Sequence, residues 1–188
     1  TVVQSNEFRV LSGRALTVTD NLVSRGLLAA DGAGASLTIQ GLGSVDLDHS
    51  RLAANGGGTI TVQNGPTSYK ASYSSIDSLS AANFFYADGS GSSIDLSGFQ
   101  SIEITGDPFN AGVGILEARI LASNSGLIDL SGVTSILRDG NPLAIEATSG
   151  ATIDLSGLTT IEADVTLRVN TSGVLNLSNL TNLNPTGT

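Results

Sequence analysis

The sequence contains no cysteine, methionine or tryptophan, and only one lysine and one histidine. Without cysteine, the chain has no disulfide bonds and no thiolate chemistry, a composition that fits many bacterial secreted proteins. Eight basic residues stand against 17 acidic ones, and the formal charge of −9 makes contacts with nucleic-acid phosphates unfavourable. The apolar runs are too short to span a membrane. We therefore expect no nucleic-acid partner and no membrane insertion.

Aromatic residues are also scarce, at 4% of the chain, so the core has to be built from isoleucine, leucine, valine and alanine. The 188 residues are enough for one domain with a sizeable core. The sequence begins at Thr1 without a methionine or a signal peptide, and we expect it to be part of a longer chain. Neighbouring domains of that parent chain are then expected partners.

One short motif is written three times, as SIDLSGFQSIEI at 93–104, GLIDLSGVTSIL at 126–137 and TIDLSGLTTIEA at 152–163. Its apolar–polar–apolar triplet can be followed along the chain, at 16–18, 37–39, 60–62, 94–96, 128–130, 153–155 and 175–177. Alternation with period two predicts a strand with one buried face. A recurrence near 22 residues predicts a solenoid, in which each repeat forms one coil.

Two further short strands are predicted in each coil. A second strand follows the triplet, at 44–46, 75–77, 101–103, 135–137, 160–162 and 182–184. A third precedes the next triplet, at 28–31, 52–55, 85–88, 120–123, 145–148 and 167–170. The third residue of this last strand is alanine five times and valine once, as a narrow corner requires. Its fourth is always Asp, Asn, Ser or Thr, whose side chains satisfy backbone groups at turns.

A column of small turn residues follows the triplets. It consists of Gly41, Asn64, Gly98, Gly132, Gly157 and Asn179. Because glycine and asparagine tolerate a left-handed backbone, we expect a sharp corner there. The sequence thus predicts an all-β fold, a right-handed parallel β-helix of about seven coils with three short strands each, in a single domain over 1–188. A leucine-rich repeat is the alternative, but it needs helical segments that the sequence lacks.

Two coils are 34 residues long and carry insertions near 63–74 and 104–116. Loops on a rigid scaffold are where binding residues concentrate. An exposed aromatic ring with polar neighbours is suited to a sugar, because the ring stacks on the apolar face and the polar groups bind hydroxyls. An outward-facing tyrosine on the third strand could add to a partner surface. The candidate ligand-binding residues are Tyr69, Lys70, Tyr73, Tyr86, Asp107, Phe109 and Asn110.

Three aspartates, Asp95, Asp129 and Asp154, occupy the middle of consecutive triplets and are expected to stack on the outer face. At about 5 Å in water, each neighbouring pair repels by roughly 0.8 kcal/mol before screening, which an exposed face tolerates without a cation. Calcium could bridge these carboxylates, because it prefers several oxygen ligands. The sequence has no calcium-binding loop motif, so no cofactor is required and Ca²⁺ is a candidate only.

This coil pattern, from Leu16 to Asn184, resembles the β-helical modules of bacterial surface and secreted proteins. Examples are filamentous-haemagglutinin-like adhesins, autotransporter passengers and β-helical carbohydrate-binding modules. The resemblance implies a non-catalytic module located outside the cell or on its surface. It carries over no site residues, because it rests on the coil pattern alone.

Three functions fit these observations. The first is a non-catalytic extracellular module that binds a polysaccharide or a cell-surface partner through its insertions. The second is a structural spacer or stalk of a large adhesin. The third is a polysaccharide lyase or hydrolase on the same fold, which is disfavoured because His49 is the only histidine and no acid–base pair with distinct roles is evident. We therefore name no catalytic residue.

Overall fold

A computed structural model describes residues 2–3, 7–41, 45–48, 50–64, 68–72, 83–105, 118–138, 143–161 and 165–183. Within these ranges the protein is all-β, with strands that pair only in parallel. The described part of the chain contains no helix, and hence none that could cross a membrane.

The strands form two long sheets, and three small sheets make up a third side, called the short-strand side below. The first long sheet contains β2 (Glu7–Leu11), β5 (Leu27–Asp31), β8 (Arg51–Asn55), β11 (Asn83–Asp88), β14 (Ala118–Ser123), β17 (Leu143–Thr148) and β20 (Val165–Asn170). The second contains β3 (Ala15–Val18), β6 (Ser36–Ile39), β9 (Thr59–Val62), β12 (Ser93–Asp95), β15 (Leu127–Asp129), β18 (Thr152–Asp154) and β21 (Val174–Asn176).

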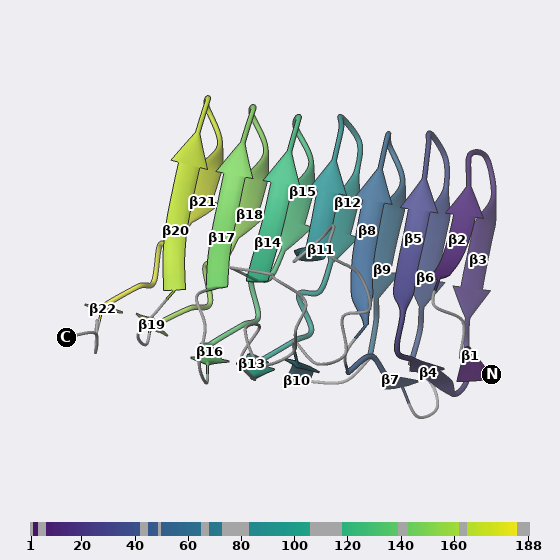
Figure 1. The fold of residues 1–188 in the computed structure, drawn as a ribbon, viewed down its shortest axis with the longest axis horizontal. Coiled ribbons are helices and arrows are strands. Elements are labelled where there is room, and N and C mark those ends of the chain that lie inside the picture. Colours follow the sequence, from purple (N-terminus) through teal and green to yellow (C-terminus); the bar gives the residue numbers. More distant parts are fainter. Residues whose placement is uncertain are drawn as a thin grey trace, which may run out of the picture.

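The short-strand side is interrupted into three small sheets. These are β1 (Val2–Val3) with β4 (Leu22–Ser24) and β7 (Val45–Asp46); β10 (Ser68–Ser72) with β13 (Ser101–Thr105) and β16 (Ser135–Arg138); and β19 (Thr160–Ile161) with β22 (Asn182–Leu183). From β2 onwards the chain visits the first long sheet, the second long sheet and the short-strand side in that order, seven times. Each such pass is called a coil below. Figure 1 shows the coils side by side from the N-terminal to the C-terminal end.

The first two residues of all seven predicted triplets lie in the strands of the second long sheet, and the first residues stack in one register. Leu16 pairs with Leu37, and the column continues through Ile60, Ile94, Ile128, Ile153 and Leu175. Stacking of like on like lets each of the five coils between the first and the last bury the same apolar side chain, and each buried isoleucine or leucine contributes about 1.5–3 kcal/mol. The repetition of the sequence is thus explained by the repetition of the core.

The predicted third strands form the first long sheet, also in register. Ala30, Ala54, Ala87, Ala122 and Ala147 are stacked and fully buried, as expected for a narrow corner. The polar residues at the ends of these strands bond from coil to coil. Asn55 Nδ2 donates to Asp31 Oδ1 at 2.7 Å, and Ser123 Oγ donates to Asp88 Oδ1 at 2.6 Å. These bonds satisfy polar groups at the edge of the core.

One predicted strand is placed differently. We expected residues 75–77 to form the second strand of the coil that contains β9, but the strand is β10, Ser68–Ser72, which pairs with β13 so that Tyr69 lies opposite Ile102. Residues 75–77 lie outside the described residues. Much of the insertion predicted at 63–74 is therefore strand, and the long connection of this coil is 73–82.

The corner after the triplets was predicted to need a left-handed backbone, but at Gly132 and Gly157 close packing is the reason for the glycine. Gly41 and Asn64 do have positive φ, but Gly98, Gly132 and Gly157 do not. A Cβ on Gly132 would lie 2.1 Å from the carbonyl oxygen of Ser97 in the coil before, and one on Gly157 would lie 2.3 Å from that of Ser131. Only glycine fits where two backbones approach so closely.

Left-handed residues lie instead at the corner that joins the two long sheets, along the top in Figure 1. Every coil has at least one there: Gly13, Gly32, Gly34, Gly56, Gly57, Gly89, Gly91, Asn124, Ser125, Ser149, Gly150, Thr171 and Ser172. In the first four coils all of these residues are glycine, which adopts positive φ at no steric cost. At this corner the chain passes from the first long sheet to the second.

Candidate functional site

The two long connections begin at neighbouring positions. Residues 73–82 follow β10 and residues 106–117 follow β13, and the last residues of these strands, Ser72 and Thr105, are register partners. Adjacent strands of a sheet lie about 4.8 Å apart, so both connections start from one place on the short-strand side. The corresponding connections in the following coils are much shorter, at 139–142 and 162–164.

Lys70 lies on the strand that leads to this place. Its side chain is exposed, and Nζ lies 3.0 Å from Oε2 of Glu103, its register partner on β13. The hydrogen bond to Glu103 and the charge of that carboxylate raise the pKa of Lys70, so the side chain is positively charged at neutral pH. Its backbone N–H donates to Asp48 Oδ1 at 2.9 Å, which ties the strand to the coil before.

The short-strand side also carries a charged cluster that sequence reasoning did not identify. Arg25 binds Asp46 with two bonds, Nη1 to Oδ1 at 2.8 Å and Nη2 to Oδ2 at 2.5 Å, and Nη1 donates to the Asp48 carbonyl oxygen at 3.2 Å. The hydrogen bond to Asp46 raises the pKa of Arg25 above its ordinary value. A forked pair of this kind is a fixed geometry. Little in the sequence indicated this pair, because Asp46 lies on a predicted second strand but Arg25 follows β4, which was not predicted.

Tyr69, predicted to be an exposed sugar-stacking ring, is in the core. It is 1% exposed, its ring centroid lies 4.8 Å from that of Phe85, and Phe84 and Phe99 lie at 6.3 and 6.4 Å. Its hydroxyl donates to the Ser50 carbonyl oxygen at 2.5 Å. The prediction of an exposed Tyr69 was therefore wrong, because Tyr69 takes the inward position of β10.

Of the remaining ligand-binding candidates, Tyr86 lies on another side of the fold and the others lie outside the described residues. Tyr86 lies on β11 in the first long sheet, half-buried, with Ala53 and Leu121 as its register partners. It does not share a sheet with Lys70. The other four candidates, Tyr73, Asp107, Phe109 and Asn110, lie outside the described residues. Of the three candidates that the structure describes, Lys70 is therefore the one exposed on the short-strand side, where the long connections begin.

The three aspartates of the triplets stack as expected, with Asp95 opposite Asp129 and Asp129 opposite Asp154. Each carboxylate also has a local role, since its Oδ1 accepts the backbone N–H two residues later. The distances are 3.1 Å from Ser97, 2.9 Å from Ser131 and 2.8 Å from Ser156. This bond holds the corner that follows the strand. In the described ranges, no group of three acidic or histidine side chains is arranged to hold a metal ion. Calcium binding stays a prediction.

Asp154 provides a test of this corner bond. Burial opposes its ionisation, but hydrogen bonds from the Ser156 hydroxyl, the Ser156 N–H and Asn176 outweigh burial and lower the pKa of Asp154. A carboxylate with a lowered pKa in the folded state stabilises the fold above its unfolded pKa of about 3.9. That stabilisation is lost as the pH falls through the folded-state pKa.

We therefore expect Asp154→Asn to destabilise the protein near pH 6 and to have a decreasing effect below about pH 4, where wild-type Asp154 becomes neutral as well. Urea unfolding of both proteins between pH 2 and pH 7 measures this difference. A difference in unfolding free energy that does not change with pH would contradict a role for the charge of Asp154.

Comparison with protein families, with curated proteins and with solved structures found no match to the chain. The site is therefore interpreted from its own geometry.

Proposed function

We propose that this chain is a non-catalytic module of a bacterial extracellular or cell-surface protein, and that it binds a polysaccharide or a cell-surface partner through 73–82 and 106–117. The scaffold of this proposal is a single right-handed parallel β-helix of seven coils with three strands each. Its support is the fixed order of the sheets and the parallel pairing of consecutive coils (Figure 1).

The observation that carries the proposal is the pairing of Ser72 with Thr105, from which the two long connections start. Residues 73–82 contain Tyr73, and residues 106–117 contain Asp107, Phe109 and Asn110. Each of the two segments therefore has an aromatic ring and polar groups. Lys70 and Glu103 stand on the strands just before them. Two neighbouring segments on a rigid scaffold are a common arrangement for binding an extended ligand.

A structural spacer is the second candidate. The charged side chains of the short-strand side bind one another, as in Arg25 with Asp46 and Lys70 with Glu103, and so do not need a ligand. The stacked apolar columns would serve equally well in a stalk between neighbouring domains of a parent chain. Unlike the first candidate, a spacer does not need 73–82 or 106–117 to bind a ligand.

Affinity electrophoresis against plant and microbial polysaccharides separates the two candidates. We expect one glycan class to retard the protein, and replacement of 73–82 by a short Gly/Ser linker to abolish the retardation. Lys70→Ala should weaken it several-fold. The matched control replaces 139–142, the same connection one coil after 106–117, with a Gly/Ser segment of equal length, and should leave binding unchanged.

The same experiment with calcium and with a chelator tests whether the aspartate column takes part. If binding requires calcium that the aspartate column holds, Asp129→Asn should abolish binding even when calcium is present. Equal mobility of the wild type and of the variant lacking 73–82 on every glycan would contradict the binding proposal and favour the spacer.

A further inference from the structure

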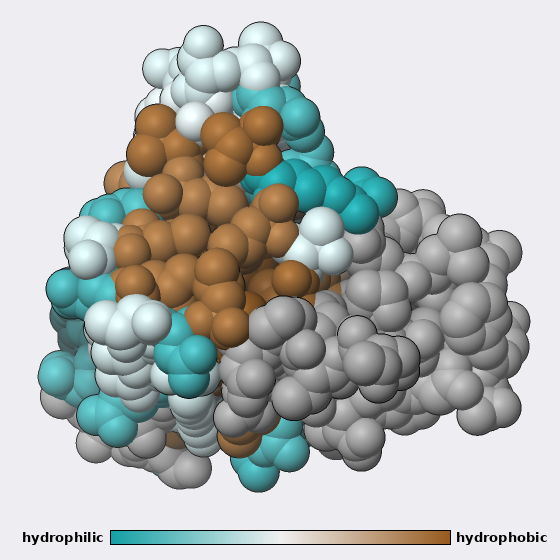
Figure 2. Space-filling model, turned by 90° about the vertical axis from the view of Figure 1, so that its left-hand side faces the viewer, coloured by the Kyte–Doolittle hydropathy of each residue, from teal (hydrophilic) through white to brown (hydrophobic). Residues whose placement is uncertain are grey.

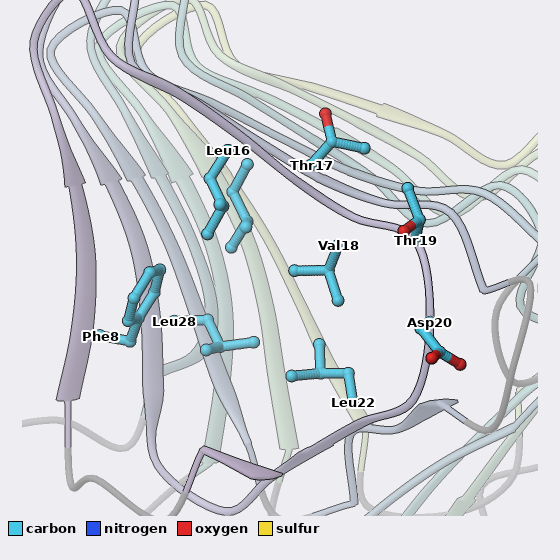
Figure 3. Close-up of a pocket in the computed structure, with 9 residues that line it drawn as sticks. Phe8, Leu16, Thr17, Val18, Thr19, Asp20, Leu22 and Leu28 are labelled. Carbon is cyan, nitrogen blue, oxygen red and sulfur yellow. The ribbon is translucent and has the colours of Figure 1, made fainter. Parts of the chain in front are cut away.

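Seven large apolar side chains are exposed among the described residues, and five of them belong to the first or last coil. Figure 2 looks onto the last coil and shows apolar side chains gathered over the middle of this face. At the first coil, Leu16, Val18 and Leu22 point into a cavity of about 250 Å³ between the two long sheets (Figure 3). Both surfaces are the interior of the coil stack at the places where the described coils stop, so they do not point to a ligand.

The other two exposed apolar side chains lie on the sides of the fold. Leu127 begins β15 in the second long sheet and is 41% exposed. Leu137, on β16 of the short-strand side, is 42% exposed and is the register partner of Glu103. Because Glu103 pairs in turn with Lys70, Leu137 continues the row of side chains beside which the two long connections begin.

Two columns of side chains point outward from β10, β13 and β16, the middle strands along the lower edge of Figure 1. They point outward because the residue between the two columns is buried in each strand. Neighbouring strands lie about 4.8 Å apart, so each column spans roughly 10 Å over three coils. One column consists of the half-buried serines Ser68, Ser101 and Ser135, and the other consists of Lys70, Glu103 and Leu137.

The described basic side chains on this side are already bonded to carboxylates. Lys70 Nζ lies 3.0 Å from Glu103 Oε2, and Arg25 holds both carboxylate oxygens of Asp46. A carboxylate or sulfate group of a ligand would have to compete with these partners for the same donors. Neither cation is therefore a ready site for an anion.

The connections on this side are acidic throughout. Together, 73–82, 106–117, 139–142 and 162–164 contain six acidic residues and no basic one. With Lys70, Glu103 and Arg138 of the strands before them, the region has seven acidic against two basic residues, an excess of five negative charges. The first three connections begin one coil apart, and a spacing of about 4.8 Å is less than the screening length of about 8 Å at physiological salt. Their charges therefore act together, and they repel a polyanion.

We propose that the ligand of the two long connections is an uncharged polysaccharide, which lies across the outer face of β10, β13 and β16, and that polyanionic glycans are rejected. This inference rests on the proposed function, since it assigns a chemical class to the ligand of the same site. Leu137 packs on the apolar face of a sugar ring, and the serine hydroxyls exchange hydrogen bonds with its hydroxyl groups. The Lys70–Glu103 pair can bind hydroxyl groups as well without breaking, because an ammonium group has three donors.

The test compares an uncharged glycan with an anionic form of the same glycan. An uncharged polysaccharide that retards the protein is oxidised at its primary hydroxyl groups to carboxylates, and the dissociation constants of both forms are measured by calorimetry. We expect affinity for the uncharged form to change less than about two-fold between about 50 mM and 500 mM salt. The oxidised form should bind at least about ten-fold more weakly at the lower salt concentration, and the higher one should reduce this difference.

Leu137→Ser tests the apolar contact and should weaken binding of the uncharged glycan about three- to ten-fold. Leu127→Ser is the matched control, because Leu127 is equally exposed but lies on another side of the fold, and it should leave binding unchanged. Glu103→Gln removes a carboxylate and releases Lys70 from its ion pair, so it should bring the affinities for the oxidised and uncharged forms closer together. Circular dichroism of each variant establishes that it is folded.

The possible outcomes distinguish this inference from the proposed function. Retardation by polyanionic glycans but not by uncharged ones would overturn the inference and leave the binding module standing. Binding of a cationic glycan alone, with an affinity that salt weakens, would do the same. Equal affinity for the oxidised and uncharged forms, or a difference that salt does not change, would show that charge is not the reason for rejection and would also overturn it. Equal losses from Leu127→Ser and Leu137→Ser would contradict the placement of the glycan on this face. Retardation by no glycan of any charge would overturn the inference and the proposed function together.

Discussion

Replacement of Tyr69 with alanine is expected to lower the free energy of unfolding by about 3–5 kcal/mol, the usual loss when a buried aromatic side chain is truncated. The ring is 1% exposed and lies between two coils, against Phe85 of the next coil at 4.8 Å. Its removal leaves a cavity bordered by rings that cannot all move into it. The loss should be visible in urea or thermal unfolding followed by circular dichroism.

Tyr69→Phe is the informative companion variant. It keeps the ring and removes the hydroxyl, which donates to the Ser50 carbonyl oxygen, and should cost about 0.5–1.5 kcal/mol. Burial, together with the negative charge of Asp48, raises the pKa of Tyr69 well above its ordinary value. The wild type should therefore lose stability as the pH rises above about 10, where the unfolded tyrosine ionises, and Tyr69→Phe should lose less. A loss below 1 kcal/mol for Tyr69→Ala would contradict the placement of the ring in the core.

Replacement of Gly132 with alanine should destabilise the protein by about 1–3 kcal/mol or more. The new Cβ would lie 2.1 Å from the carbonyl oxygen of Ser97 and 2.8 Å from that of Phe99. Both atoms belong to the backbone of the coil before, which hydrogen bonds hold in place, so the two coils would have to separate locally. Since coils stack along one axis, such a separation also disturbs the strands on either side of the corner.

Gly98→Ala is the matched control. Gly98 stands in the same column and also lacks a positive φ, but a Cβ there would meet nothing within 4 Å. The coil before it reaches its corner through Gln63 and Asn64 instead of a Ser–Gly pair. The substitution should be neutral or stabilising by about 0.4–1 kcal/mol, because alanine restricts the unfolded chain. Equal effects of Gly98→Ala and Gly132→Ala in urea unfolding would show that contact with the preceding coil is not the reason for the glycine.

The two long sheets could be predicted from the sequence because several independent signals agree there. Period-two alternation defines inward and outward positions, and the alanine column of the first long sheet fixes the register. A shift by one residue would turn every apolar side chain outward, so the pattern admits one alignment. The structure follows that alignment from Leu16 to Leu175.

The short-strand side was harder to predict because its signal is only three residues long. Ser68-Tyr69-Lys70 and Ser75-Ile76-Asp77 both read as serine, apolar, charged, and both follow the same triplet. The pairing of Tyr69 with Ile102 and its contacts with three phenylalanines distinguish the two, and these contacts join segments far apart in the sequence. The link between Arg25 and Asp46 was missed for the same reason, since it depends on how two short strands align.

The position of the aromatic cluster sets the order in which the fold can come apart. Tyr69, Phe84, Phe85 and Phe99 belong to the third and fourth of seven coils, so the largest buried side chains lie near the middle of the stack. In a linear array each coil is held only by its neighbours, so unfolding that begins in an outer coil of the described stack spreads from coil to coil. It should be slowest at the third and fourth coils, where the aromatic cluster joins one coil to the next.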